Sequence, residues 1–225
     1  MSAALLHQLV NGLAALMLLV SFSLLAQHRM LAVLQWFAAQ GVLLAATAAL
    51  VAYGTGDSNL YISAVLALAL KGLLLPWLLW RIVRELHVHR EVEPLMNMAL
   101  TMLIAIGLTL FAYYVIEPIE RAAELLTRDS MAIALACVLL GMLMMITRRK
   151  AVTQVVGFLA IENALFFAAI GATNGMPMVV ELGIAFDVLV AALIFGLFFF
   201  QIRSTFDTLE VEALHKPLVE EEEER

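Results

Sequence analysis

Residues 59–84 read NLYISAVLALALKGLLLPWLLWRIVR. The stretch is apolar almost throughout, and it is longer than the roughly 20 residues that an α-helix needs to cross the hydrocarbon core of a bilayer. Lys71 lies near its middle, and Pro76 follows a little more than one helical turn later. The stretch therefore predicts a membrane-spanning helix with an ionisable side chain at mid-depth. Near Pro76 we expect disturbed helical hydrogen bonding, because proline has no N–H to donate.

The composition of the whole chain also indicates a membrane protein. Of its 225 residues, 64% are hydrophobic and 14% are charged, and the mean hydropathy is +0.97. A soluble protein of this length could not cover so much apolar surface, and the apolar runs are too long for the strands of a membrane barrel. We expect an all-α, polytopic membrane protein with about seven transmembrane helices. The predicted spans are 5–26, 30–53, 59–84, 96–116, 129–147, 152–173 and 177–202.

The order of features in the first spans recurs in the last ones. A span with Gln40, a glycine-containing loop and a span with Lys71 correspond to a span with Glu162, another such loop and a span with Asp187. We interpret this as two related three-helix units in parallel orientation, the alternative being chance similarity among Leu/Ala-rich helices. The predicted organisation is a first three-helix unit with a cytoplasmic loop (1–95), a linking helix with an outer loop (96–128), a second three-helix unit (129–203) and an acidic cytoplasmic tail (204–225).

The 13 basic residues are divided unequally between the two sides of the predicted membrane domain. Connections on the side of the N-terminus carry Arg121 and Arg128 only, and Lys71 is inside the membrane. Because cytoplasmic loops are enriched in Lys and Arg, we predict an outer N-terminus and a cytoplasmic C-terminus. The ten basic residues of the predicted cytoplasmic side are Arg29, Arg81, Arg84, Arg90, Arg148, Arg149, Lys150, Arg203, Lys216 and Arg225.

The polar residues at mid-depth are the candidate site. Lys71, Glu162 and Asp187 lie near the middle of their predicted spans, Gln40 lies at the same depth, and Glu181 lies nearer the outer end of its span. A charged side chain at the bilayer centre costs about 2.5–3.5 kcal/mol on insertion scales, and such residues typically mark paths for protons or ions. We predict that these five residues contribute to a proton path. The alternatives are a hydrogen-bonded structural carboxyl, a static ion pair of Lys71 and a helix–helix hydrogen bond of Gln40.

The sequence shows no catalytic centre of its own. Its single cysteine, Cys137, lies inside the fifth predicted span and has the character of a small apolar residue. There is no CxxC or Cys/His cluster, no nucleotide-binding loop and no catalytic triad in the chain. We therefore expect no cofactor, no metal and no nucleic-acid partner, and at most a non-catalytic role within a larger enzyme.

Two segments resemble a known family. Residues 148–164, RRKAVTQVVGFLAIENA, are similar to the second helix of the small three-helix K-type subunit of respiratory complex I, and the segment from Ala185-Phe186-Asp187 onward is similar to its third helix. Over the full length, including Gly175-Met176-Pro177 and the Phe-Asp-Thr-Leu sequence of the tail, the chain resembles the hydrogenase-4 component E family. These proteins are membrane subunits of hydrogenases related to complex I.

The resemblance implies a non-catalytic subunit of a membrane oxidoreductase in a bacterial or archaeal cytoplasmic (inner) membrane. It also implies an obligate hetero-oligomer in which antiporter-like subunits are the partners in proton or sodium translocation. Asp187 falls on the third-helix carboxylate position of the K-type subunit, although that position is usually Glu. Leu159 occupies the second-helix position, and Glu162 lies one turn away on the same helix face. The first unit has Gln40 and Lys71 at the corresponding places, so it cannot use two carboxylates.

Two other functions fit the sequence. The chain could be a structural spacer of the same membrane arm that carries no ions. It could also be a seven-helix receptor, pigment or transporter that acts alone, although Lys71 is not in the last span and no broken helix marks a binding site.

Overall fold

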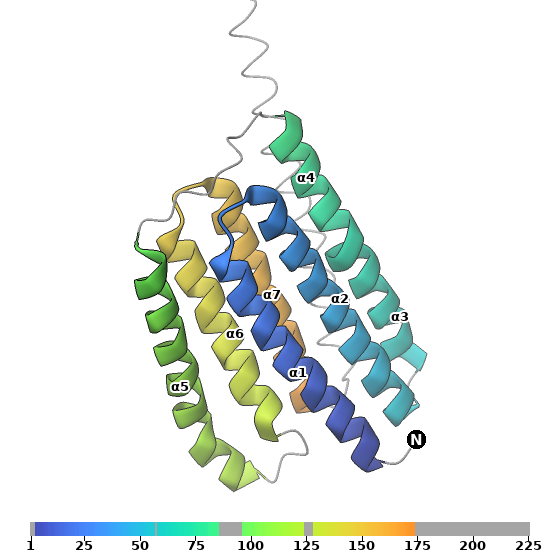
Figure 1. Cartoon of the computed structure of the whole chain (residues 1–225). Coiled ribbons are helices and arrows are strands. Elements are labelled where there is room, and N and C mark those ends of the chain that lie inside the picture. The colour runs from blue at the N-terminus through green and yellow to red at the C-terminus, as the bar shows by residue number, and fades with distance from the viewer. Residues whose placement is uncertain (1–2, 57, 86–95, 124–127, 174–225) are drawn as a thin grey trace, which may run out of the picture. The chain divides into compact units, whose positions relative to one another are not determined.

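The computed structural model describes residues 3–56, 58–85, 96–123 and 128–173. The chain divides into two compact units, 1–185 and 186–225, and all described residues belong to the first. Nearly all of the described residues are helical (Figure 1). The helices are α1 (Ala3–Ala26), α2 (Met30–Thr55), α3 (Ser58–Ala67), the π-helical segment η1 (Leu68–Leu74), α4 (Leu75–Glu85), α5 (Met98–Ala123), α6 (Arg128–Thr147) and α7 (Ala151–Thr173).

The predicted all-α membrane fold is confirmed. Because α3, η1 and α4 follow one another without interruption, they act as one long helix. Within the described part of the chain, six helices are long and apolar enough to cross a membrane. They are Leu5–Ala26, Met30–Thr55, Leu60–Arg84, Met98–Glu117, Ser130–Thr147 and Ala151–Gly171, which agree with the first six predicted spans to within a few residues. The predicted seventh span, 177–202, lies outside the described residues.

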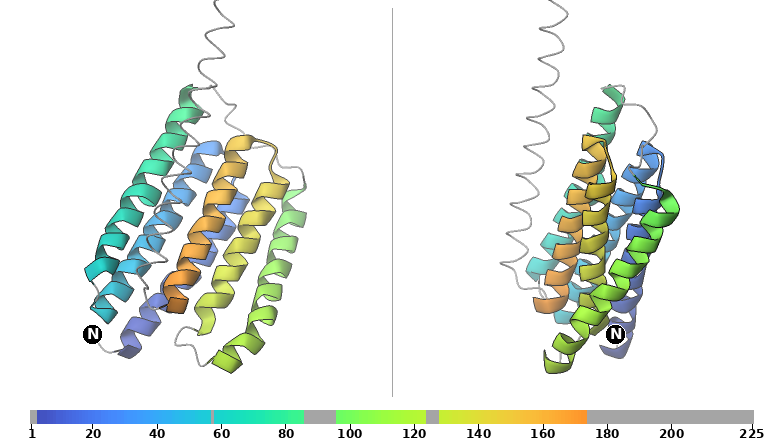
Figure 2. Two further views of the ribbon diagram at one scale, coloured as in Figure 1. Left: turned by 180° about the vertical axis from the view of Figure 1, so that it is seen from behind. Right: turned by 90° about the vertical axis from the view of Figure 1, so that its left-hand side faces the viewer.

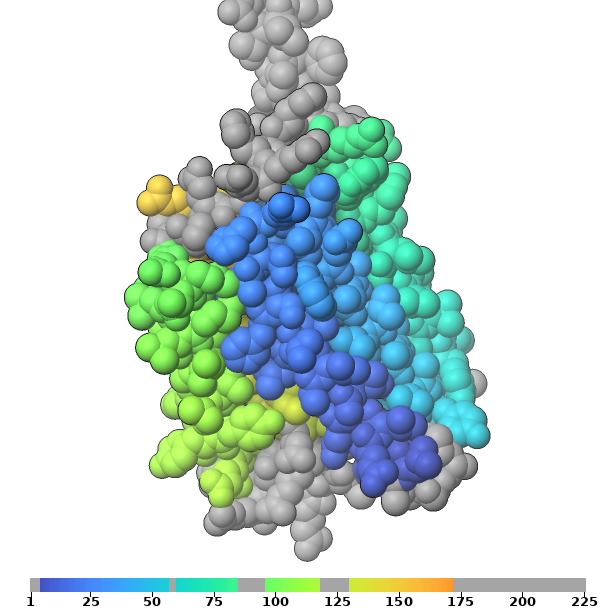
Figure 3. Space-filling view, in the orientation of Figure 1, coloured from blue at the N-terminus to red at the C-terminus, as the bar shows by residue number. Residues whose placement is uncertain are grey.

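Two helical hairpins form the centre of this unit. The α1–α2 hairpin lies beside the α6–α7 hairpin, with α1 against α6 and α2 against α7. The long helix α3–η1–α4 packs on α2 at one edge, and α5 packs on α6 at the other (Figures 1 and 2). On the face seen in Figure 3, α1 lies between α5 and α2. The first helices of the two predicted units, α1 and α6, thus pair with each other, and so do the second helices, α2 and α7, but the duplication itself stays a prediction.

The long helix changes its winding beside the proline. Residues Leu68–Leu74 are π-helical, and the N–H of Leu75 bonds to the carbonyl oxygen of Leu70, five residues back. Pro76 follows immediately and cannot donate a backbone hydrogen bond. The disturbance expected near Pro76 thus takes the form of a π-helical segment, and Lys71 lies in the middle of it. Such segments are often found at functional sites.

Aromatic side chains lie near the two ends of the unit. All four tyrosines of the chain are exposed where α2 ends, α3 begins and the apolar part of α5 ends. At the opposite end Trp77 and Trp80 are exposed, with the guanidinium of Arg81 5.8 Å from the Trp77 ring and that of Arg84 5.1 Å from the Trp80 ring. Tyr and Trp are enriched at membrane–water interfaces, so these two levels are consistent with the boundaries of the bilayer. The tyrosines are Tyr53, Tyr61, Tyr113 and Tyr114.

Candidate functional site

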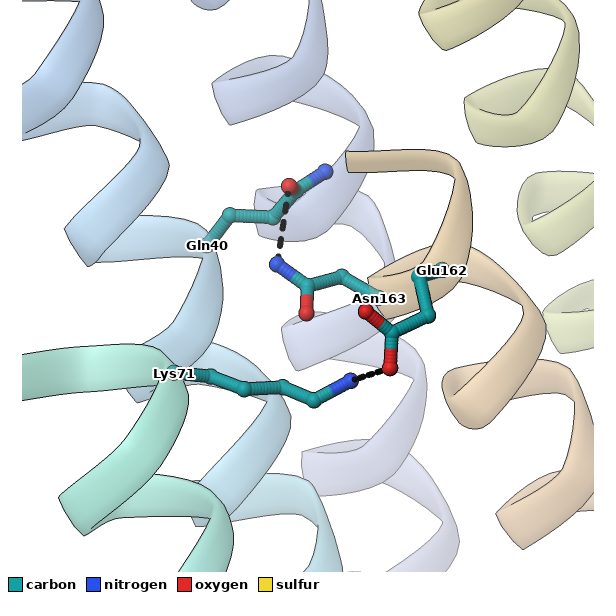
Figure 4. Close-up of polar contacts among 4 residues, drawn as sticks. All are labelled: Gln40, Lys71, Glu162 and Asn163. Carbon is teal, nitrogen blue, oxygen red and sulfur yellow. Dashed lines mark hydrogen bonds and ion pairs between the residues drawn. The ribbon is translucent and has the colours of Figure 1, made fainter. Parts of the chain in front are cut away.

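A buried ion pair lies halfway along the helices. Lys71 of η1 donates from Nζ to Oε1 of Glu162 on α7 at 2.8 Å (Figure 4). Lys71 is 1% exposed and Glu162 is 9% exposed. Glu162 follows the first residue of α7 by 11 positions, which places it about 16 Å along the helix at 1.5 Å per residue. The pair therefore lies near the middle of a span, as the sequence predicted for each residue separately.

A chain of amide and hydroxyl groups runs next to this pair. Gln40 of α2 donates from Nε2 to the hydroxyl of Ser21 on α1 at 3.1 Å, and its Oε1 accepts a bond from Nδ2 of Asn163 at 3.2 Å. Ser21 in turn donates to the carbonyl oxygen of Met17 at 2.9 Å. All these side chains are buried. Because Asn163 is the neighbour of Glu162 on α7, the hydrogen-bond chain and the ion pair meet there (Figure 4).

The surroundings of the ion pair are apolar and aromatic. The Lys71 ammonium lies 5.0 Å from the centre of the Phe166 ring, a distance at which a cation is attracted to the ring face. Phe166 follows Glu162 by one turn of α7, so the same helix supplies the carboxylate and the ring. Phe37 precedes Gln40 on α2 by three residues and Leu44 follows it by four, and both side chains are fully buried. Removing one member of a buried ion pair typically costs about 3–5 kcal/mol, because the other charge is left uncompensated.

Two acceptor atoms of the cluster have no donor among the described residues. They are Oε2 of Glu162 and Oδ1 of Asn163, and both are buried. A buried acceptor without a partner is costly, and in native proteins it usually has an ordered water, an ion or another side chain nearby. Chemically, Oε2 of Glu162 can accept a proton, and both oxygens can accept hydrogen bonds from water.

Glycines allow the backbones to approach at this level. A Cβ atom on Gly41 would lie 2.6 Å from the carbonyl oxygen of Lys71 and 2.9 Å from the amide nitrogen of Gly72. No side chain could be accommodated there without moving backbone, so Gly41 lets α2 lie directly against η1. The sequence pairs Gln40-Gly41 and Lys71-Gly72 each combine a polar side chain with the small residue that permits the approach.

The structure brings three of the five predicted site residues together. Gln40, Lys71 and Glu162 belong to one polar cluster, whereas Asp187 and Glu181 lie outside the described residues. The expected helix–helix hydrogen bond of Gln40 is present. Neither Ser21 nor the partnership of Asn163 with Gln40 was predicted from the sequence. The only signal for them was polarity within apolar runs, which does not reveal which helices are neighbours.

A second buried cation lies at the end of the helices. Arg148, between α6 and α7, is 1% exposed and donates from Nη2 to the carbonyl oxygens of Leu25 and, at 2.9 Å, Gln27 at the end of α1. Burial lowers the pKa of Arg148 from its ordinary value, although a guanidinium remains charged in proteins. Cations at helix C-termini interact favourably with the helix dipole. Arg148 therefore ties the α6–α7 connection to the C-terminal end of α1, a role that its position in a basic run did not reveal.

Comparison with known proteins reveals relatives over nearly the whole chain. An uncharacterised protein of Mycobacterium tuberculosis, Rv0085, is 35% identical over 209 residues, which cover 92% of this chain and 95% of that protein. Hydrogenase-4 component E of Escherichia coli K12 is 26% identical over 206 residues, covering 92% and 95% of the two chains, and the Shigella flexneri protein of that name matches equally. No protein-family model and no solved structure matches the chain.

The length of these matches agrees with the resemblance noted in the sequence, and the six apolar helices agree with a membrane protein. The chain belongs to the family of membrane proteins that includes the mycobacterial protein and hydrogenase-4 component E.

Proposed function

We propose that the chain is a membrane subunit of a complex I-like, hydrogenase-type complex, and that its buried polar cluster takes part in proton translocation. The observation that carries the proposal is the Lys71–Glu162 ion pair at mid-depth, with Glu162 Oε2 left as a buried acceptor. The family membership supports the assignment to such a complex. By the same resemblance, the partners would be antiporter-like subunits of the membrane arm, and the chain would lie in the cytoplasmic membrane with its N-terminus outside.

The geometry suits a relay in which charge neutralisation loosens the ion pair. A proton that arrives at Oε2 of Glu162 makes the carboxyl group neutral, because a new O–H bond forms on the oxygen that Lys71 does not contact. The attraction between Glu162 and the Lys71 ammonium then falls, and Lys71 can release its proton to a neighbouring acceptor. Lysine at buried positions can alternate between its two protonation states in this way.

A proton fits this cluster better than a sodium ion. The Lys71 ammonium lies 2.8 Å from Oε1 of Glu162, so a metal cation at the same carboxylate would be repelled by it. A proton adds no separate cation with a coordination shell. Asp187 and Glu181 complete the proposed path, Asp187 because of its position in the resemblance and Glu181 as an entrance near the outer end of its span.

A structural role is the second candidate, and one observation favours it. The ion pair and the hydrogen bonds of Gln40 connect α1, α2, η1 and α7, which belong to both predicted units. A static cluster of this kind would fasten the helices and fix their register. The chain would then be a spacer in the membrane arm.

The variant Glu162→Gln separates the two candidates. It preserves the shape of the side chain and an oxygen that accepts a hydrogen bond from Lys71, which as a buried lysine can become neutral once the carboxylate is gone, while it removes the titratable proton. If the pair is a relay, the purified complex should be assembled and its redox turnover retained, while proton uptake into proteoliposomes falls at least several-fold. Glu117→Gln, at an exposed position on α5, is the matched control and should pump normally. An assembled Glu162→Gln complex that pumps at the wild-type rate would favour the spacer.

A further inference from the structure

A cavity of about 270 Å³ lies at the end of the unit that carries the N-terminus of α1. Four helices line it: His7 belongs to α1, Thr47 and Thr55 to α2, Ser130 to α6 and Phe167 to α7. Since one water takes up roughly 30 Å³ of liquid volume, the cavity has room for several. The walls come from both central hairpins, and so the cavity exists only because the hairpins lie side by side.

The polar groups of this cavity suit water. Ser130 is 2% exposed, and its buried Oγ has no hydrogen-bond partner in the part of the chain that the structure describes. The hydroxyls of Thr47 and Thr55 donate to the carbonyl oxygens of Leu43 and Val51, so their oxygens remain acceptors. His7 is partly exposed and adds a ring that can both accept and donate a proton. A cavity water needs two to four polar partners, and this set supplies them.

The cavity and the polar cluster lie on the same helix faces. Phe167 follows Asn163 by four residues on α7, a distance of about 6 Å along the axis, and Thr47 follows Gln40 by seven residues on α2, about 10 Å. Residues four or seven positions apart share a face of an α-helix. The inner end of the cavity is therefore one to two turns from the two unpartnered acceptors, and Phe167, which is 2% exposed, lies in between.

We propose that this cavity is a hydrated vestibule through which the polar cluster exchanges protons with the side of the membrane that holds the N-terminus of α1. The inference rests on the proposed function and deepens it, because it adds an entrance that is formed by described residues. His7 takes a proton from solvent on the unprotonated nitrogen of its neutral ring and passes it to water in the cavity. Water held by Ser130 and Thr47 carries it inward, each transfer forming one O–H bond as another breaks, until it reaches Oε2 of Glu162. A shift of the Phe167 ring opens the last part of the path, the one helical turn between the cavity and Glu162.

Thiol labelling tests the hydration directly and without transport. In the assembled complex, Ser130→Cys in a Cys137→Ala background is exposed to the small water-borne reagent methanethiosulfonate ethyltrimethylammonium, and modification of this chain is measured by mass spectrometry. We expect labelling at least tenfold faster than for Ala134→Cys in the same background, since Ala134 is one turn further along α6, buried, and does not line the cavity. Native Cys137, buried two turns beyond Ser130, should also label slowly. Equal rates at positions 130 and 134 would overturn the vestibule.

A second experiment, on proton uptake, tests whether the cavity supplies protons to the polar cluster. Ser130→Leu fills the cavity and removes the hydroxyl, and we expect a several-fold loss of proton uptake with the complex assembled, whereas Ser130→Thr keeps the hydroxyl and should retain most of it. Full pumping by Ser130→Leu, together with loss of pumping in Glu162→Gln, would refute the vestibule and leave the proposed function intact. Full pumping by Glu162→Gln would refute the proposed function, and the proton entrance with it.

Discussion

At the scale of single residues, Lys71 and Glu162 combine a high cost with a specific geometry. Each would be expensive alone in the middle of an apolar helix, and their 2.8 Å contact compensates both charges. The pairing also explains why two charged residues 91 positions apart in sequence occur at the same depth. The decisive question for function is whether Lys71 and Glu162 exchange protons or only neutralise each other's charge.

Removing the charges singly and together answers that question. Lys71→Met alone leaves the Glu162 carboxylate buried without its partner, and should reduce stability by about 3–5 kcal/mol, seen as poor assembly of the complex. The double variant Lys71→Met with Glu162→Leu removes both charges, and apolar replacement of a buried pair is often neutral or stabilising. We therefore expect the double variant to assemble. If it also pumps protons at the wild-type rate, the pair is structural and the relay is wrong.

At the scale of helices, the site depends on how closely α2 and η1 approach. The π-helical segment holds Lys71 at the contact. Gly41, which has no side chain, lies opposite the Lys71 backbone. The directions of the Gln40 and Lys71 side chains thus depend on the close backbone contact as well as on their own hydrogen bonds. An added methyl group at this contact would separate the two helices and disturb the polar cluster.

The variant Gly41→Ala should be destabilising despite the better helix propensity of alanine. Its Cβ would meet backbone atoms at 2.6–2.9 Å, and overpacking of this kind costs about 1–3 kcal/mol. Gly107→Ala on α5 is the control, because a Cβ there meets nothing within 4 Å. Thermal unfolding of the purified complex should show a lower Tm for Gly41→Ala and an unchanged or higher Tm for Gly107→Ala. The reverse order would contradict the close contact between α2 and η1.

At the scale of the whole described unit, the two central hairpins are joined at one end by Arg148 and halfway along by the polar cluster. Arg148 reaches carbonyl oxygens near the end of α1 from the α6–α7 connection, so a single side chain links both hairpins. The cavity lies at the opposite end of the unit, between the same helices. Polar contacts thus join the two hairpins. Such contacts matter in a membrane, because apolar side chains interact with lipid about as favourably as with other helices.

Arg148 and Arg149 form a matched pair for a test of this linkage. Arg148→Met leaves the carbonyl oxygens of Leu25 and Gln27 without their donor and should cost about 1–3 kcal/mol. Arg149→Met removes the same charge from an exposed neighbour and should be close to neutral. Both variants change the basic residues of the connection equally, so a difference in assembled complex reports the buried contacts. Equal yields and equal Tm values would show that Arg148 does not link the hairpins.

The sequence by itself determined the class of the protein and the level of its site. Continuous apolar runs of about 20 residues can satisfy their backbone groups in lipid only as helices, so the first six spans could be placed to within a few residues. The sequence also predicted the mid-span depth of Lys71, Glu162 and Gln40, because the helical rise per residue converts a position in the span into a depth. The partners of those residues were not readable, because Leu/Ala-rich helices have no strong pattern that dictates which faces meet. Only the tertiary structure decided that Lys71 contacts Glu162, that Gln40 bonds Ser21 and Asn163, that Arg148 is buried on α1, and that a cavity lies between the hairpins. The physical reason is that these features arise from close contact between helices distant in the chain, which small residues such as Gly41 permit but do not specify.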